Sequence, residues 1–147
     1  MKIRVFLLLI AAIAVTSCDS NDPVSNLTNE EQILEYLQDN NITASKTDSG
    51  LYYVIDEPGS ADRPSATSVV RVTYRGYMLN GDQFDGGTID ISLQQVIAGW
   101  TEGIQLFGRG GSGALYIPSD LAYGSRGAGS IPPFTPIAFD IELLDFQ

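Results

Sequence analysis

Hydrophobic positions along the chain follow a helical period first and a strand period afterwards. In residues 27–42 the apolar side chains recur at helical spacings, Thr28 is expected to cap the helix, and Glu31 completes a capping box. From Gly50 onward the period becomes that of strands, and apolar and polar positions alternate most regularly in residues 68–78. The pattern therefore predicts one helix of about three turns followed by a β-rich domain.

The β-rich region divides into five strands and one internal helix. The helix is expected within residues 94–107, where apolar side chains return to helical spacing, and an Asn-Gly pair within residues 79–85 predicts a tight reversal. One small core requires this helix to lie across the concave side of the sheet. We expect an α+β fold, in which a twisted antiparallel five-stranded half-barrel sheet wraps one short central helix and the N-terminal helix is an extension. The strands are expected in residues 50–57, 68–78, 87–93, 108–118 and 136–146.

The first eighteen residues, "MKIRVFLLLIAAIAVTSC", have the pattern of an export signal. Lys2 and Arg4 precede an apolar run, in residues 5–15, that is too short to span a bilayer comfortably. The ending "VTSC" is typical of a bacterial lipoprotein signal, in which cleavage leaves Cys18 as the lipidated N-terminus; an ordinary exported protein with an isolated cysteine is the alternative. We expect a signal peptide in residues 1–17, a flexible tether in 18–26, a helical extension in 27–49 and the main domain in 50–147. This predicts an exported protein that is lipid-anchored in the bacterial cell envelope, on the periplasmic or cell-surface side.

Composition and charge exclude several kinds of function. Removal of residues 1–17 leaves six cations against eighteen carboxylates, a balance that argues against nucleic acid as a partner and against membrane contact other than through the lipid. The chain has no histidine and a single cysteine, which excludes Ser-His-Asp and Cys-His catalysis and histidine-ligated metals. The phosphate-binding motif GxxxxGK[ST] is absent from the sequence. We therefore expect no metal and no cofactor.

Four sequence blocks resemble the FKBP-type peptidyl-prolyl isomerases in order and in approximate spacing. They are "VTYRGYMLNGDQFD", "VIAGWTEGI", "SDLAYGSRGAGSIPP" and "FDIELL", and together they extend the resemblance over residues 68–144. Matched position by position, the resemblance implies three catalytic residues, Tyr74, Asp85 and Tyr123. It also implies a substrate-binding pocket formed by Phe84, Val96, Ile97, Trp100, Ile131 and Phe139.

The resemblance further implies a role for each group. Trp100 is the floor of the pocket, and the Tyr123 hydroxyl and the backbone N–H of Ile97 donate hydrogen bonds to substrate carbonyls. Asp85 lies at the rim, near the rotating amide or hydrogen-bonded to Tyr74. Residues 122–136, whose glycines and prolines give them the composition of a linker, are instead expected to fold back over the pocket as a flap.

The function implied is peptidyl-prolyl cis-trans isomerisation of Xaa-Pro bonds in envelope or exported proteins. Proline-containing polypeptides are the expected substrates, and macrolides of the FK506 or rapamycin type are expected inhibitors of a monomeric protein. The alternative is a non-catalytic module that holds proline-containing segments or unfolded chains in the same pocket. That alternative rests on departures from the family pattern at Ile89 and at Gly86–Gly87.

Overall fold

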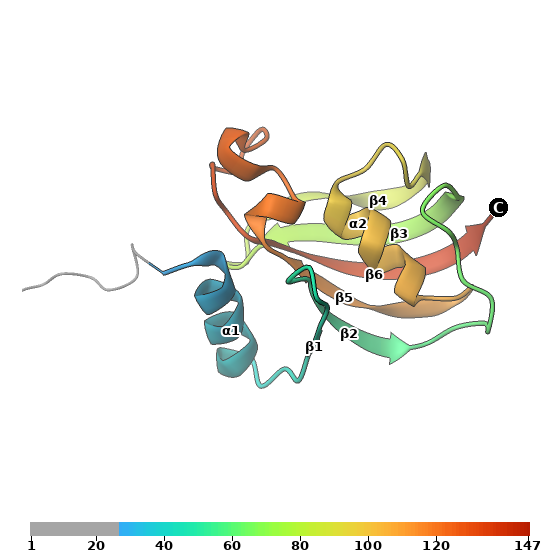
Figure 1. Cartoon of the computed structure of the whole chain (residues 1–147), viewed down its shortest axis with the longest axis horizontal. Helices are drawn as coiled ribbons and strands as arrows, with labels where there is room; N and C mark the ends of the chain where they lie inside the picture. The colour runs from blue at the N-terminus through green and yellow to red at the C-terminus, as the bar shows by residue number, and fades with distance from the viewer. Residues whose placement is uncertain (1–26) are drawn as a thin grey trace, which may run out of the picture.

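Six strands form one antiparallel sheet in the computed structural model, which describes residues 27–147 (Figure 1). The predicted signal peptide, Cys18 and the predicted tether lie outside the described residues. The strand order is β1-β2-β5-β6-β3-β4, so the chain crosses over between β2 and β3 and again between β4 and β5. The strands are β1 Ser45–Lys46, β2 Tyr52–Glu57, β3 Val69–Met78, β4 Gln83–Ser92, β5 Gly111–Ile117 and β6 Ile137–Phe146.

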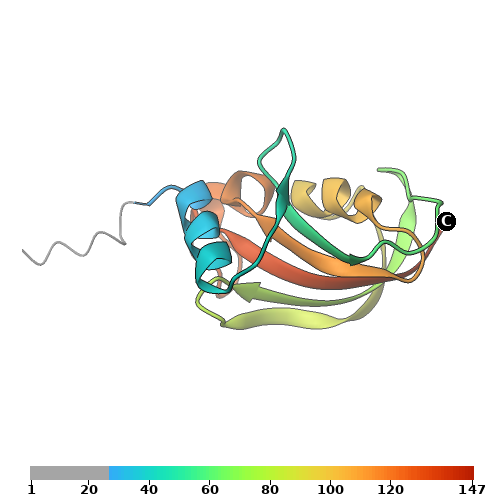
Figure 2. The ribbon, with the colours of Figure 1, turned by 90° about the horizontal axis from the view of Figure 1, so that it is seen from below.

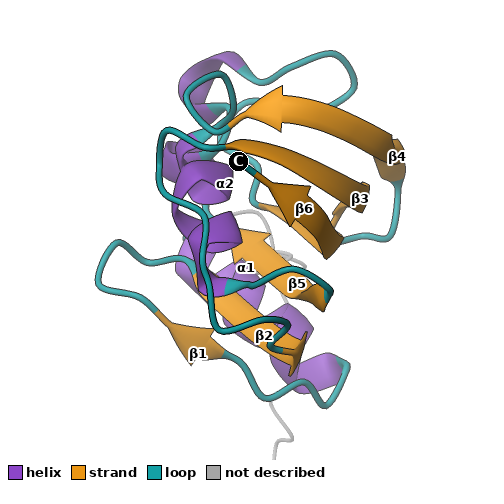
Figure 3. Cartoon of the chain, turned by 90° about the vertical axis from the view of Figure 1, so that its right-hand side faces the viewer, coloured by secondary structure: helices purple, strands orange, loops and turns teal. Residues whose placement is uncertain are grey.

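The predicted α+β fold is confirmed, with one strand more than expected. The sheet curves around a short helix, α2 (Ala98–Gly103), which lies across one face of it (Figures 2 and 3). The additional strand is β1, whose two residues pair with Tyr52 and Tyr53 at the edge of the sheet. Two exposed polar residues carry no hydrophobic period, which is why the sequence did not predict this strand.

The N-terminal helix, α1, covers Asn29–Asp39, and its predicted capping is confirmed. Thr28 Oγ1 accepts a hydrogen bond from the Glu31 backbone N–H at 3.3 Å, and the Glu31 carboxylate accepts one from the Thr28 N–H at 2.8 Å. The two bonds satisfy donors that a helix start otherwise leaves unpaired. The first turn of α1 is therefore well defined by its own sequence.

Two hydrophobic clusters lie on opposite faces of the sheet. In β5, Leu115 and Ile117 belong to the cluster that contains α2, whereas Ala114 and Tyr116 belong to the cluster that contains α1. Since successive side chains of a strand point to opposite faces, α2 fills the concave face and α1 packs on the other. Ile33, on α1, is fully buried there.

The structure differs from the sequence prediction in where β4 begins and in the extent of α2. β4 begins at Gln83, four residues before the predicted start, so Phe84 and Asp85 are strand residues. Pairing with β3 along its full length outweighs the low strand propensity of this segment. The central helix begins only at Ala98, because Ile97 adopts an extended backbone with ψ 151°, and it continues as a 3₁₀ turn over Ile104–Leu106.

Residues 118–136 connect β5 to β6 at one end of the sheet (Figure 1). Two 3₁₀ turns, Ser119–Leu121 and Gly124–Arg126, and a bridge between Ala128 and Ile131 give this connection a defined backbone. Within residues 27–147, no helix is both long enough and apolar enough to cross a membrane.

Candidate active site

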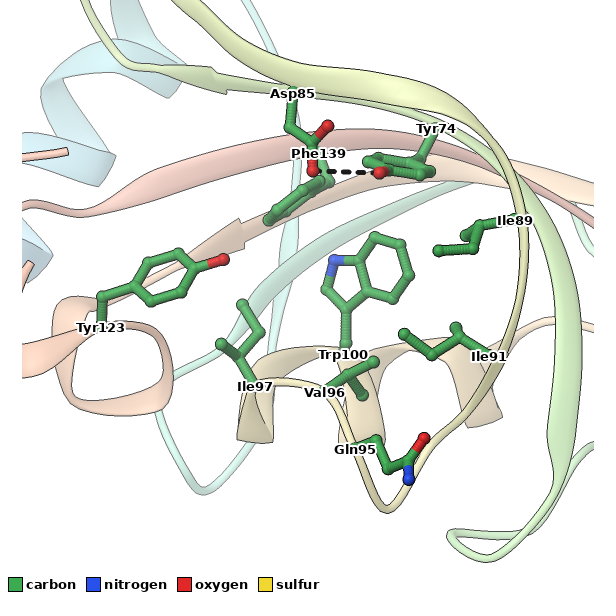
Figure 4. Close-up of a pocket in the computed structure, with 10 residues that line it drawn as sticks. All are labelled: Tyr74, Asp85, Ile89, Ile91, Gln95, Val96, Ile97, Trp100, Tyr123 and Phe139. Carbon is green, nitrogen blue, oxygen red and sulfur yellow. Dashed lines mark hydrogen bonds between the residues drawn. The ribbon is translucent and has the colours of Figure 1, made fainter. Parts of the chain in front are cut away.

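A cavity of about 270 Å³ opens on the concave face of the sheet, above α2 (Figure 4). Its walls come from β3, β4, β6, the turn before α2 and the β5–β6 connection. Segments far apart in the sequence therefore meet here. The lining residues are Tyr74, Asp85, Ile89, Ile91, Gln95, Val96, Ile97, Trp100, Tyr123 and Phe139.

Trp100 forms the floor of this cavity. It lies on α2 with 5% of its surface exposed, and its ring meets those of Tyr74 and Phe139 edge to face, at centroid distances of 5.1 and 5.2 Å. Its indole Nε1 is buried and has no hydrogen-bond partner among the described residues. Figure 4 shows this nitrogen on the side of the cavity where Ile97 and Tyr123 lie. An unpaired buried N–H is costly, and a bound acceptor would remove that cost.

Tyr74 and Asp85 form a hydrogen-bonded pair on the opposite wall. The Tyr74 hydroxyl donates to Asp85 Oδ2 at 3.0 Å, while Asp85 Oδ1 accepts from the backbone N–H of Gly86 at 2.8 Å. The bond is possible because β4 already runs beside β3 at these positions, with Asp85 opposite Gly76. Burial, and secondly the bond to Asp85, raises the pKa of Tyr74, so its phenol is protonated at neutral pH.

Tyr123 projects its hydroxyl into the cavity from the β5–β6 connection (Figure 4). Burial raises the pKa of Tyr123, and the charge of Asp85 raises it further, so this hydroxyl also keeps its proton. It makes no hydrogen bond within residues 27–147. The backbone N–H of Ile97, the residue that caps α2, likewise donates to no acceptor among these residues. Together with Trp100 Nε1, the site therefore presents three donors that have no partner among the described residues.

Two predicted pocket residues, Phe84 and Ile131, do not line the cavity. Phe84 packs behind Phe139, with the two rings edge to face at 5.6 Å. Ile131 is 5% exposed and belongs to the concave core beside the pocket, where its backbone pairs with Ala128. Phe84 thus supports the wall from behind, and Ile131 belongs to the buried core rather than to the lining.

Three lining residues were not among the predicted site residues. Ile89 and Ile91 lie two and four positions along β4 from Gly87, on the same face as Asp85, so an earlier predicted start of the strand would have identified them. The family resemblance identifies Ile89 only as a departure from the family pattern. Gln95 lies in the turn before α2, and nothing in its sequence context pointed to the pocket.

Metal ligands do not gather in the part of the chain that is described. No group of three histidine, cysteine, aspartate or glutamate side chains there could hold a metal ion. The cavity itself is lined by aromatic and aliphatic side chains, with Asp85 the single carboxylate among them. The lining residues offer an apolar shape, hydrogen-bonding groups and exclusion of water.

Comparisons with known proteins agree with this geometry. A model of the family described as FKBP-type peptidyl-prolyl cis-trans isomerase matches residues 60–144. FkpA of Aeromonas hydrophila, described as an isomerase of this type, is 43% identical over 106 residues, which cover 69% of this chain and 40% of that protein. The chain thus spans about two fifths of the length of the curated relatives it matches.

Two solved structures resemble most of the chain. The crystal structure of FkpA from Escherichia coli superposes with a TM-score of 0.74 at 35% identity, covering 81% of this chain and 59% of that one. A peptidyl-prolyl cis-trans isomerase from Pseudomonas syringae superposes with a TM-score of 0.71 at 32% identity, covering 81% and 93%. The match over residues 60–144, more than half of the sequence, shows that the chain belongs to the FKBP-type peptidyl-prolyl cis-trans isomerase family.

Proposed function

We propose that this chain catalyses cis–trans isomerisation of Xaa-Pro peptide bonds. The observation that supports this most directly is a largely apolar, aromatic cavity in which the Tyr123 hydroxyl and the Ile97 N–H are free to donate hydrogen bonds. Isomerisation breaks no covalent bond, and its barrier of roughly 18–20 kcal/mol is the loss of amide resonance. A site without histidine or a reactive cysteine is suited to that reaction.

The proline ring of the substrate would pack against Trp100 and Phe139. A planar amide is more dipolar than a twisted one, so transfer from water into an apolar cavity disfavours the ground state more than the transition state. The Tyr123 hydroxyl and the Ile97 N–H would each hold a carbonyl of the substrate, which fixes one side of the bond while the other turns. Each tenfold gain in rate requires about 1.4 kcal/mol of such differential binding.

Asp85 would act through its charge and its partner. Its carboxylate holds the Tyr74 phenol against the wall, beside the edge of Trp100. The same charge favours the protonated form of Tyr123, which is the form that donates. Catalytic roles for Tyr74, Asp85 and Tyr123 and binding roles for Val96, Ile97, Trp100 and Phe139 are therefore parts of one proposal.

A protease-free assay of cis-to-trans relaxation in an Xaa-Pro peptide tests this function. We expect the purified protein to accelerate relaxation, and a macrolide of the FK506 type to inhibit it. Trp100 is the chain's only tryptophan, so intrinsic fluorescence reports macrolide binding in the pocket. Relaxation at the uncatalysed rate, with a normal fluorescence response, would favour the non-catalytic binding module over the enzyme.

Replacing Tyr123 with phenylalanine is expected to lower kcat/KM roughly tenfold, since one hydrogen bond to the substrate is lost. Thermal stability should hardly change, because the hydroxyl makes no hydrogen bond within the described residues. Tyr116→Phe is the matched control: its ring lies on the opposite face of the sheet and is 2% exposed. An unchanged kcat/KM in Tyr123→Phe would remove the proposed donor role.

We also propose that the protein is exported and anchored by lipid on Cys18, where it would act as a monomer on proline-containing envelope or exported proteins. The support is the sequence: two cations, an apolar run and the ending "VTSC". Bacteria grown with labelled palmitate should label the wild-type chain and not Cys18→Ala, which should also leave the membrane fraction. Equal labelling of both chains would disprove the anchor.

A further inference from the structure

Asn29, the first residue of α1, contacts both ends of the connection that carries Tyr123. Its side-chain Oδ1 accepts a hydrogen bond from the Ser119 backbone N–H at 2.5 Å. Its Nδ2 donates to the Phe134 carbonyl oxygen at 2.9 Å. Figures 1 and 2 show α1 beginning beside the 3₁₀ turns of this connection. One side chain thus joins residues 119 and 134 to the N-terminal helix.

The chemistry of the two contacts requires an amide. The Ser119 N–H needs an acceptor and the Phe134 carbonyl needs a donor, and an asparagine side chain offers one of each. Ser119 is 4% exposed and begins a 3₁₀ turn whose preceding residue, Pro118, supplies no side-chain cap. Asn29 therefore satisfies a buried N–H that the connection cannot satisfy by itself.

Residues 119–134 make no other hydrogen bond to a distant part of the described chain. Their remaining bonds are internal or to the adjoining residues Pro118 and Thr135; the internal ones include Ala128 N–H to the Ile131 oxygen and Phe134 N–H to the Gly124 oxygen, at 3.0 and 2.8 Å. Packing on the concave core is the other attachment: Ile131 is buried in it, and Leu121, Ala122 and Tyr123 pack against it. The two hydrogen bonds with Asn29 are therefore the ones that attach residues 119–134 to a distant part of the chain.

Phe134 marks the point where this connection is under strain. Its φ of 56° lies in the left-handed region, which is unusual for a bulky residue, and its side chain is 62% exposed. Burial does not hold it in this conformation. Its backbone is bonded on one side to Gly124, the neighbour of Tyr123, and on the other to Asn29.

The helix that carries Asn29 is itself firmly attached. Ile33 and Leu37 are 0% and 5% exposed on the convex face of the sheet. Next to Asn29, the Glu30 carboxylate accepts hydrogen bonds from the Tyr52 hydroxyl at 2.8 Å and from Lys46 Nζ at 2.7 Å. The first turn of α1 thus links β1 and β2 to the connection that carries Tyr123.

We propose that Asn29 is a positioning residue for the isomerase reaction, holding residues 119–134 in the arrangement that directs the Tyr123 hydroxyl into the pocket. The N-terminal extension is then a functional part of the site rather than a spacer. This inference rests on the proposed isomerase function and adds a residue outside the four sequence blocks that carry the family resemblance.

Asn29→Ala in the full chain tests the inference with two readouts. Because both bonds are lost, we expect amide hydrogen exchange at Ser119 to become roughly tenfold faster and kcat/KM to fall roughly tenfold. Asn29→Asp keeps the acceptor for Ser119 and loses the donor for Phe134, so exchange at Ser119 should stay near the wild-type rate and kcat/KM should be intermediate. Asn40→Ala is the matched control at the other end of α1, where the Asn40 side chain bonds only to the Tyr36 oxygen, at 2.8 Å.

A double variant separates positioning from general stability. If Asn29 acts through Tyr123, adding Asn29→Ala to Tyr123→Phe should lower kcat/KM little further, because the hydroxyl being positioned is already gone. Unchanged exchange at Ser119, unchanged kcat/KM in Asn29→Ala, or an equal loss in Asn40→Ala would each overturn the inference. Absence of isomerase activity in the wild-type protein would instead overturn the proposed function itself, and with it the catalytic part of this one.

Discussion

Replacing Phe139 with alanine is expected to lower the free energy of unfolding by about 3–5 kcal/mol and kcat/KM about a hundredfold. Phe139 is 3% exposed, and its ring lies between those of Trp100, Phe84 and Tyr74, at centroid distances of 5.2, 5.6 and 6.2 Å. Its removal opens the cavity wall and leaves Trp100 without one of the two rings it meets edge to face. The proposed proline site would lose one of its two aromatic contacts.

Phe107→Ala is the control that separates an effect on the site from an effect on the stability of the fold. Phe107 is fully buried in the same concave core and does not line the cavity. Urea unfolding should show a similar cost for both variants, whereas kcat/KM per folded molecule should fall only for Phe139→Ala. Phe139→Leu provides a milder substitution if the alanine variant does not fold. An equal loss of kcat/KM in Phe107→Ala would show that Phe139 acts through stability alone.

Most of the fold could be predicted because the sequence patterns that define its helices and strands each lie within a short segment of the chain. The alternation in β3 and the capping box at Thr28 are each contained within a few residues, and both are present in the structure. The early start of β4 is different, since Gln83 to Gly86 gain their strand conformation from pairing with β3. The strand propensity of these residues does not indicate that pairing.

The site was predictable only as far as residue types matched a family pattern. That pattern named Trp100, Tyr74 and Tyr123 together, and the structure places all three around one cavity. It did not name Asn29, whose partners are 90 and 105 residues away along the chain. A polar residue at the start of a helix is ordinarily explained by helix capping alone, so the contact becomes visible only in three dimensions.

The linker-like composition of residues 122–136 has a specific structural cause. Gly127 adopts a φ of +64°, and a side chain there would collide with the Ile131 carbonyl. The glycine therefore permits the tight Ala128–Ile131 bridge, and the prolines restrict the chain on the way back to β6. The glycines and prolines of this segment suggest disorder, but the tightly folded connection between β5 and β6 requires them.

The second large effect is expected at Gly76, a glycine in the middle of β3. A methyl group at this position would lie 2.6 Å from Phe139 Cε1 and 2.7 Å from Phe84 Cε2, well inside normal contact distance. Gly76→Ala should therefore force both rings away from β3, at a cost of about 1–3 kcal/mol in the free energy of unfolding. Since Phe139 is a wall of the cavity, we expect kcat/KM to fall at least roughly tenfold.

Phe84→Leu supplies the control for this prediction, because Phe84 supports the wall without lining the cavity. The smaller leucine should make room for the added methyl group, so Gly76→Ala/Phe84→Leu should be more stable and more active than the sum of the single effects. Close neighbours typically show coupling of about 0.5–3 kcal/mol, which urea unfolding resolves. Additive losses in the double variant would mean that Gly76 is needed for strand pairing rather than for the space it leaves to the two rings.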